Sequence, residues 1–119
     1  MKKTTIAFIV FAGATITGRQ PSTAMQRIPQ FENARVASWK SIIPPGSQST
    51  FHRHDYGRTV VGLTGGELKT VTADGRATAH RFETGKAYWL DPDPPGQMHK
   101  DVNDTDRLIE LVVVEMRSK

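Results

Sequence analysis

Residues 46–65 read GSQSTFHRHDYGRTVVGLTG, and this stretch contains two histidines, His52 and His54, separated by one residue. In an extended strand alternate side chains project to the same face, so this spacing places the two imidazoles next to each other. Two neutral imidazoles on one face suit a divalent transition metal. The pair alone is weak support for a metal site, since histidines at this spacing also occur on solvated strands.

A second stretch of similar character is found at residues 94–103, which read PPGQMHKDVN. Proline and glycine at its start exclude a strand interior and predict a rigid turn. A third histidine, His99, follows this turn, and Asn103 ends the stretch. The chain therefore carries two segments in which turn residues precede histidines at short range.

Between and beyond these segments the sequence predicts short strands separated by turns. The expected strands are residues 34–43, 49–54, 59–64, 67–72, 77–82, 85–90, 97–103 and 108–116. Asp74-Gly75 predicts a hairpin, and the last strand, apolar on both faces, predicts a fully buried central position. No segment has a helical period, so about eight short strands predict a closed or double-sheet all-β fold.

The order and spacing of these residues resemble the two signature motifs of the cupin superfamily, G-x5-H-x-H-x3-E-x6-G and G-x5-P-x-G-x2-H-x3-N. The first motif is matched at Gly46, His52, His54 and Gly65, and the second at Pro94, Gly96, His99 and Asn103, with Gly85 three residues further upstream than usual. The resemblance spans residues 31–116 and implies a cupin-type double-sheet jelly-roll barrel. It also implies that His52, His54 and His99 converge on one divalent metal, such as Fe, Mn, Ni or Zn.

One position departs from the pattern: the glutamate ligand of the family falls at Arg58, or at Thr59 if the gap is counted one residue longer. Arginine is a permanent cation without an acceptor and cannot ligate a metal. Three outcomes follow. The histidines bind metal alone, and Arg58 with Tyr56 binds an acidic substrate; or Asp55, Tyr56 or Glu110 supplies the missing oxygen; or the metal is lost and the pocket binds a small anion.

The N-terminal residues have the layout of a secretory signal. Two lysines, Lys2 and Lys3, precede the uncharged residues 4–18, whose apolar part is shorter than the about 20 residues that span a bilayer. A small-x-small site predicts cleavage after Ala24. We therefore expect a signal peptide at residues 1–24, a single cupin barrel domain at residues 25–119, and a periplasmic or secreted protein that is free of the membrane after cleavage.

Composition narrows the range of partners. The chain has 16 basic and 12 acidic residues. The first 24 residues contain three of the basic residues and no acidic one, so residues 25–119 have 13 basic and 12 acidic residues. The remaining charges are interspersed, and this excludes nucleic acid as a partner. The absence of cysteine excludes disulfides, thiolate metal sites and a cysteine nucleophile. A barrel of this size buries a limited core, so a homodimer is expected.

Three residues outside the motifs complete these expectations. His80 is predicted to lie on the surface, while Trp39 and Trp89 are predicted to fill the barrel wall. For function, the resemblance implies a mononuclear metal-dependent dioxygenase, isomerase, lyase or decarboxylase that acts on a small carboxylate. The alternatives are a non-catalytic ligand- or metal-binding barrel and a structural domain with a vestigial pocket, since fold does not decide function.

Overall fold

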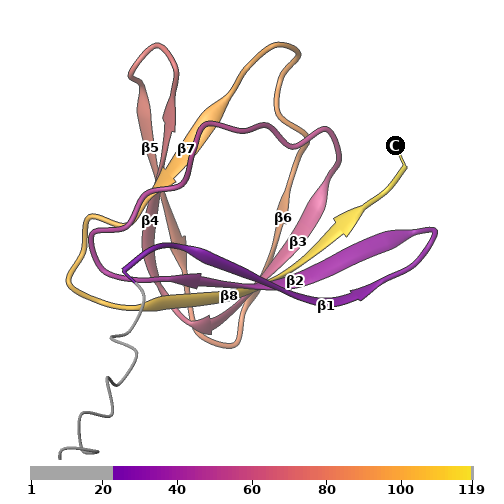
Figure 1. Ribbon diagram of the computed structural model, residues 1–119, viewed down its shortest axis with the longest axis horizontal. Coiled ribbons are helices and arrows are strands. Elements are labelled where there is room, and N and C mark those ends of the chain that lie inside the picture. The colour runs from indigo at the N-terminus through magenta and orange to yellow at the C-terminus, as the bar shows by residue number, and fades with distance from the viewer. Residues whose placement is uncertain (1–22, 119) are drawn as a thin grey trace, which may run out of the picture.

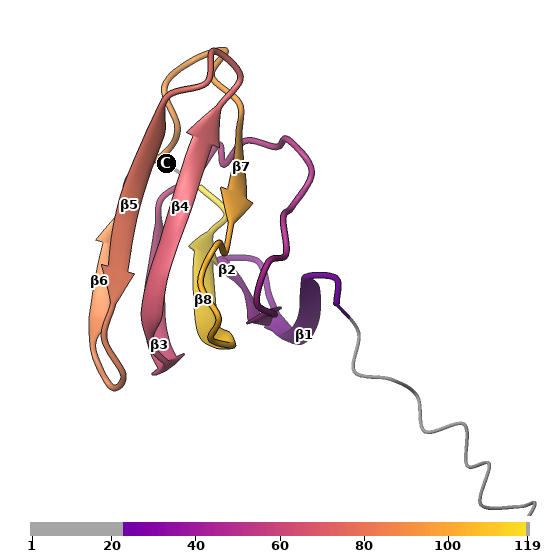
Figure 2. The ribbon, with the colours of Figure 1, turned by 90° about the vertical axis from the view of Figure 1, so that its left-hand side faces the viewer.

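The computed structural model describes residues 23–118, which form two antiparallel sheets that face each other (Figures 1 and 2). The strands are β1 Gln26–Glu32, β2 Val36–Ile43, β3 Arg58–Thr64, β4 Gly66–Thr72, β5 Ala77–Phe82, β6 Ala87–Leu90, β7 His99–Val102 and β8 Ile109–Met116. The described residues contain no helix that is long and apolar enough to cross a membrane. The expected all-β, double-sheet architecture is confirmed.

The larger sheet has the strand order β1-β2-β8-β3-β6, and the smaller one has the order β5-β4-β7. Strand β8 lies in the middle of the larger sheet and pairs with β2 and β3. Its burial alternates: Ile109, Leu111 and Val113 are buried, whereas Val112 and Val114 are only half-buried. The expected burial on both faces was wrong, because only one face of this sheet packs against the other sheet.

The hydrophobic core lies between the two sheets. Its buried members are Trp39, Ile43, Val60, Leu68, Phe82, Ile109, Leu111 and Val113. Each such side chain stabilises the fold by roughly 1.5–3 kcal/mol when it is fully buried. Trp39 is in this core as expected, but Trp89 is 55% exposed, because β6 directs it away from the core and its indole N–H donates to Asp91 at 2.9 Å.

Strand β1 was not predicted from the sequence. All seven of its residues are exposed, and it includes Pro29 and an irregularity in register between Pro29 and Phe31. Proline is tolerated here because β1 is an edge strand with one neighbour. Backbone pairing with β2, rather than burial of alternate side chains, holds β1 in place, so its sequence carries no strand period.

The predicted strand at residues 49–54 is instead an irregular segment that runs antiparallel to β7. Isolated bridges pair Gln48 with Val102 and His52 with His99. Three residues lie between the two bridge positions on the loop and two lie between them on β7, so the loop carries one extra residue, as in a β-bulge. The bulge interrupts the ladder, and the expected regular strand was wrong for this reason.

Asn103 anchors this loop to the end of β7. Its side chain is 0% exposed, and its amide nitrogen donates to the carbonyl oxygens of Ile43, Pro44 and Arg107 at 2.8–3.2 Å. Its side-chain oxygen accepts hydrogen bonds from the backbone N–H and the hydroxyl of Thr105. One buried amide thus satisfies polar groups of two segments, the end of β2 and the turn between β7 and β8.

Replacing this amide is therefore expected to destabilise the barrel. The Asn103→Ala variant leaves buried carbonyl oxygens without donors, and we expect its free energy of unfolding to fall by about 1–3 kcal/mol. Urea denaturation of both proteins measures the change. The neighbouring Asp104→Ala, which removes only an exposed ion pair with Lys69, should change it by less than about 1 kcal/mol. Equal effects of the two substitutions would contradict this role of Asn103.

Candidate metal centre

The structure brings the three predicted histidines together. His52 and His54 come from the loop before β3, and His99 is the first residue of β7. One ring nitrogen of each lies within 4.8 Å of one ring nitrogen of the other two. The ring centroids are 4.6 to 5.5 Å apart. His54 and His99 are buried and His52 is half-buried, so the cluster lies inside the barrel.

Each imidazole has an oxygen acceptor within 3.2 Å of its Nδ1 atom. The pairs are His54 with Glu115 Oε2 (2.8 Å), His99 with Asp93 Oδ2 (3.2 Å) and His52 with the Thr50 carbonyl oxygen (2.8 Å). Ionised carboxylates and carbonyls only accept hydrogen bonds, so the proton of each neutral ring resides on Nδ1. The lone pair of Nε2 is left free in all three. Outer partners of this kind orient histidines that bind metals.

The unpaired nitrogen of His99 is the clearest sign of a missing partner. Its Nε2 atom is buried and makes no hydrogen bond within residues 23–118. Burial lowers the pKa of His99, and burial followed by the charge of Arg58 lowers the pKa of His54. Both rings are therefore neutral at pH 7, the form that binds a metal without releasing a proton.

The charges around the cluster leave a negative excess. Three carboxylates, those of Asp93, Asp101 and Glu115, contact the histidines within 4.0 Å. Among the described residues, two arginines line the same cavity: Arg58, which is buried, and Arg27 of β1, which is exposed. The three carboxylates outnumber the two arginines, so the site carries excess negative charge, which a bound cation would reduce. The donor set and the charge of the site both fit a divalent transition metal.

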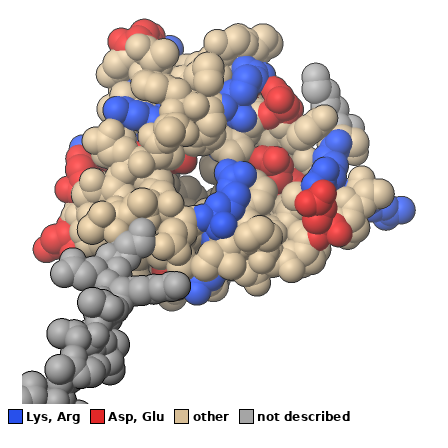
Figure 3. Space-filling view, viewed as in Figure 1, with Lys and Arg blue, Asp and Glu red and all other residues tan. Residues whose placement is uncertain are grey.

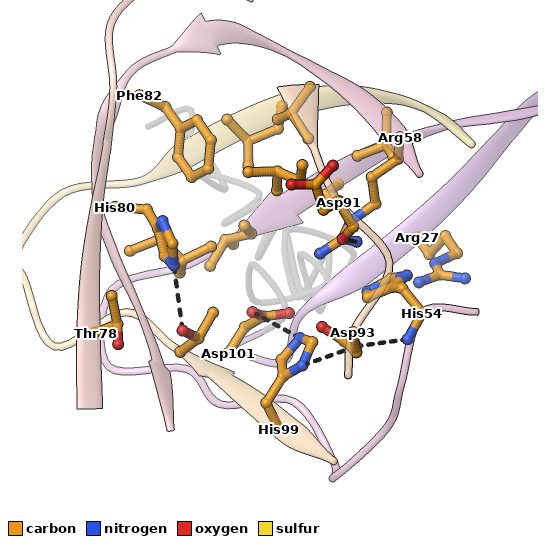
Figure 4. A pocket seen from close by; sticks show the side chains of 18 of the residues that line it. Arg27, His54, Arg58, Thr78, His80, Phe82, Asp91, Asp93, His99 and Asp101 are labelled. Atoms are coloured by element: carbon orange, nitrogen blue, oxygen red, sulfur yellow. Dashed lines mark hydrogen bonds and ion pairs between the residues drawn. The ribbon is translucent and has the colours of Figure 1, made fainter. Parts of the chain in front are cut away.

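A cavity of about 350 Å³ extends from the cluster into the barrel. Figure 3 shows a hollow on the face seen in Figure 1, with basic side chains beside it. Core side chains such as Trp39, Val60 and Phe82 line its apolar part. In Figure 4, His99 lies on one side of this space, and Arg58 and His80 lie at opposite ends of it. A cavity of this size holds a small molecule.

Arg58 is the first residue of β3 and is only 8% exposed. Burial lowers its pKa, and Asp93, Asp101 and Glu115 act against this. Within the described chain, its guanidinium has no carboxylate oxygen within 4.0 Å, and its one hydrogen bond runs to the carbonyl oxygen of Asp91 at 3.4 Å. Its other donors are available to a ligand in the cavity.

The residues considered as alternative oxygen ligands lie elsewhere. Asp55 is exposed and pairs with Arg53 at 2.7 Å, and Glu110 pairs with Lys40 at 3.2 Å. Tyr56 is half-buried in the loop before β3 and is not among the residues that line the cavity. Neither carboxylate approaches the histidine cluster.

The sequence analysis did not identify His80, Asp93 and Asp101 as residues of the cavity. His80 was expected on the surface, but it lines the cavity, and its Nε2 is 3.2 Å from the Thr70 hydroxyl. The pattern Thr78-x-His80-x-Phe82 contains the signal, because Phe82 is buried and alternate residues share a face. Asp93, just before the predicted turn, accepts a hydrogen bond from the His54 backbone N–H at 2.7 Å, and its Oδ2 atom lies 3.2 Å from Nδ1 of His99.

No family model matches this sequence, and no curated protein matches it either. Among solved structures, it resembles a cupin domain from Bordetella pertussis Tohama I with a TM-score of 0.70 and 25% identity, over 83% of this chain and 99% of the other. A conserved protein with a double-stranded β-helix domain from Klebsiella pneumoniae has a TM-score of 0.61 and 22% identity, over 82% and 81% of the chains.

An RmlC-like cupin family protein from Methanocaldococcus jannaschii has the same double-stranded β-helix, with a TM-score of 0.61 and 13% identity over 82% of this chain and 84% of the other. At these identities the latter two comparisons establish the fold alone. Together with the three clustered histidines, they show that residues 23–118 form a cupin-type barrel with a side-chain cluster that could hold a metal ion.

Proposed function

We propose that this protein is a small exported metal-binding cupin that holds a small carboxylate in its barrel. The observation that carries the proposal is the arrangement of the three histidines. Their Nδ1 atoms are engaged on the outer side, and Nε2 of His99 is buried without a partner. A buried acceptor without a donor costs about 1–3 kcal/mol, and a bound cation removes this cost.

The carboxylate is assigned by Arg58. A buried guanidinium with donors directed into a cavity binds a planar anion in a bidentate manner. Apolar side chains line the remainder of the cavity, so the favoured ligand has one acidic group on a short, largely apolar body. In Figure 4, Arg58 and His99 lie on different sides of the cavity, and this supports a ligand that is bound at Arg58 and extends toward the histidines.

In such a complex the residues have separate tasks. His52, His54 and His99 would hold the metal, which when bound supplies a Lewis acid or a centre for oxygen chemistry. Asp93 and Glu115 keep the Nδ1 protons in place and thereby direct the Nε2 lone pairs inward. Arg58 orients the carboxylate, and the apolar walls exclude water from its reacting end.

Metal content is the first test. We expect the purified mature protein to bind one Fe, Mn, Ni or Zn ion per chain, measured by mass spectrometry of the metals after loading and desalting. The His99→Ala variant removes a donor and should retain almost none. The ion should also raise the unfolding temperature of the original protein with increasing metal concentration.

His80→Ala provides the matched control for this test. It removes an imidazole from the same cavity, but from a residue that binds Thr70 and lies outside the cluster. Its metal content should equal that of the unchanged protein. Failure of all four metals to bind the unchanged protein would refute the metal site, and equal loss in both variants would refute its assignment to the three histidines.

Carboxylate binding is tested at Arg58. Short mono- and dicarboxylic acids, each compared with its amide, are titrated by calorimetry into the metal-loaded protein. Arg58→Gln should weaken acid binding about 10- to 100-fold, because a hydrogen bond to a charged group contributes about 1.5–3 kcal/mol. Arg81→Gln, which removes an exposed arginine of β5, should have no effect. Acids that bind no better than their amides would contradict the assignment.

A non-catalytic binding protein is the second candidate. The observation that favours it is Arg58, whose charge lowers the pKa of His54 and repels a cation in the same way. The two candidates differ in turnover. An enzyme converts a bound acid and loses this activity in His99→Ala while it remains folded, whereas a binding protein retains the acid unchanged.

Export is proposed on the sequence alone, since residues 1–22 lie outside the described part of the structure. The basic start and the short apolar segment support it. N-terminal sequencing of the protein from a periplasmic fraction or from the medium tests this proposal. Protein that begins at Met1 in the cytosol would contradict it.

A further inference from the structure

Asp101 lies next to the free nitrogens of two histidines. It follows His99 by two residues on β7, so the two side chains project to the same side of the strand. Its Oδ2 atom is 3.5 Å from Nε2 of His52, and its Oδ1 atom is 3.8 Å from Nε2 of His99. Figure 4 shows the carboxylate beside the His99 ring and directed into the cavity.

These two contacts place acceptors opposite acceptors. Both nitrogens carry lone pairs when the ring protons reside on Nδ1, where the Thr50 carbonyl oxygen and the Asp93 carboxylate lie within 3.2 Å. The distances are too long for hydrogen bonds. No hydrogen bond is made to the Asp101 carboxylate by any other residue of the described chain. A negative oxygen that faces two lone pairs is stabilised only by a positive charge between them.

The backbone holds Asp101 in this position. Its N–H donates to the Ser49 hydroxyl at 2.8 Å, and its carbonyl accepts from the Ser49 N–H at 2.9 Å. Both contacts belong to the pairing between β7 and the bulged loop that also carries His52. The carboxylate and the imidazole of His52 are therefore fixed relative to each other through the backbone.

The other acids of the site are already engaged. Glu115 and Asp93 bind Nδ1 atoms on the outer side of the rings, and Asp91 accepts the indole N–H of Trp89 at 2.9 Å. Among these carboxylates, Asp101 is the one that faces Nε2 atoms. It is thus the oxygen donor that can enter the same coordination sphere as the histidines.

We propose that Asp101 is the fourth, oxygen ligand of the metal, in place of the glutamate that the cupin motif has where this chain has Arg58. The inference rests on the proposed metal function. The site would then contain three nitrogens and one carboxylate, a donor set that also suits Fe and Mn. Arg58 is left free to bind substrate, and the ligand charge lost at its position is restored on β7.

The test compares metal affinity and ligand set in the full mature protein. Co²⁺ is titrated into the unchanged protein and into Asp101→Asn, and its visible absorption is recorded, because these bands report which atoms bind the ion. We expect Asp101→Asn to bind Co²⁺ at least about 10-fold more weakly, the lower end of the loss caused by removing even an outer partner of a ligand. We also expect its absorption bands to shift.

Two further variants separate a ligand from a positioning residue. Asp93→Asn changes the outer partner of His99, so it should weaken binding while the bands keep their positions. Asp104→Asn, an exposed aspartate paired with Lys69, should change neither quantity. Circular dichroism of the metal-free proteins serves as the folding check; the Asp101 side chain accepts no hydrogen bond from the described residues, so Asp101→Asn should fold normally.

The outcomes distinguish this inference from the proposal on which it rests. If the unchanged protein binds Co²⁺ and Asp101→Asn binds it with the same affinity and the same bands, Asp101 is not a ligand and the three-histidine site stands. If the unchanged protein binds none of Co²⁺, Mn²⁺ and Zn²⁺, the metal function itself fails, and the assignment of Asp101 fails with it.

Discussion

The pairing between β7 and the loop that precedes β3 is the contact on which the site depends. His52 and His99 exchange backbone hydrogen bonds at 2.8 and 2.9 Å, which brings together two histidines that are far apart in the sequence. The extra residue in the loop interrupts an otherwise regular ladder next to the site. Bulges are typical of sheet positions where a side chain must be redirected. Asn103 holds the far end of this pairing through its buried amide.

The contact between β7 and the loop also brings imidazoles and a carboxylate close together inside the barrel. The burial of imidazoles and carboxylates is unfavourable unless each group has a hydrogen-bond or charge partner. At this site only the outer side of each imidazole ring has such a partner. Each outer Nδ1 atom has an oxygen acceptor within 3.2 Å, whereas the inner Nε2 atoms and the Asp101 carboxylate face one another. The barrel thus holds an arrangement that is unfavourable in the absence of a cation. Local departures of this kind from the best packing are expected at functional sites.

Much of the site was predictable from residue types and spacing. The motif residues predicted His52, His54 and His99 as one cluster and identified Arg58 as the exceptional position. His80 and Asp101 were not predicted, because assignment of their faces requires knowledge of which side of β5 and β7 is buried. Strand β7 is short and has polar residues on both sides, so its periodicity does not indicate the inner face. In β5 the only indication is the spacing of His80 from the apolar Phe82.

By itself, the sequence determined the all-β class, the positions of seven of the eight strands and the three histidines, since alternation, turn residues and motif spacing are local properties. The tertiary structure decided which side chains meet. Edge strand β1, the bulged loop and the inward direction of Asp101 depend on backbone pairing between distant segments. Such pairing is made by main-chain groups that every residue carries, and for this reason it has no signature in the order of the side chains.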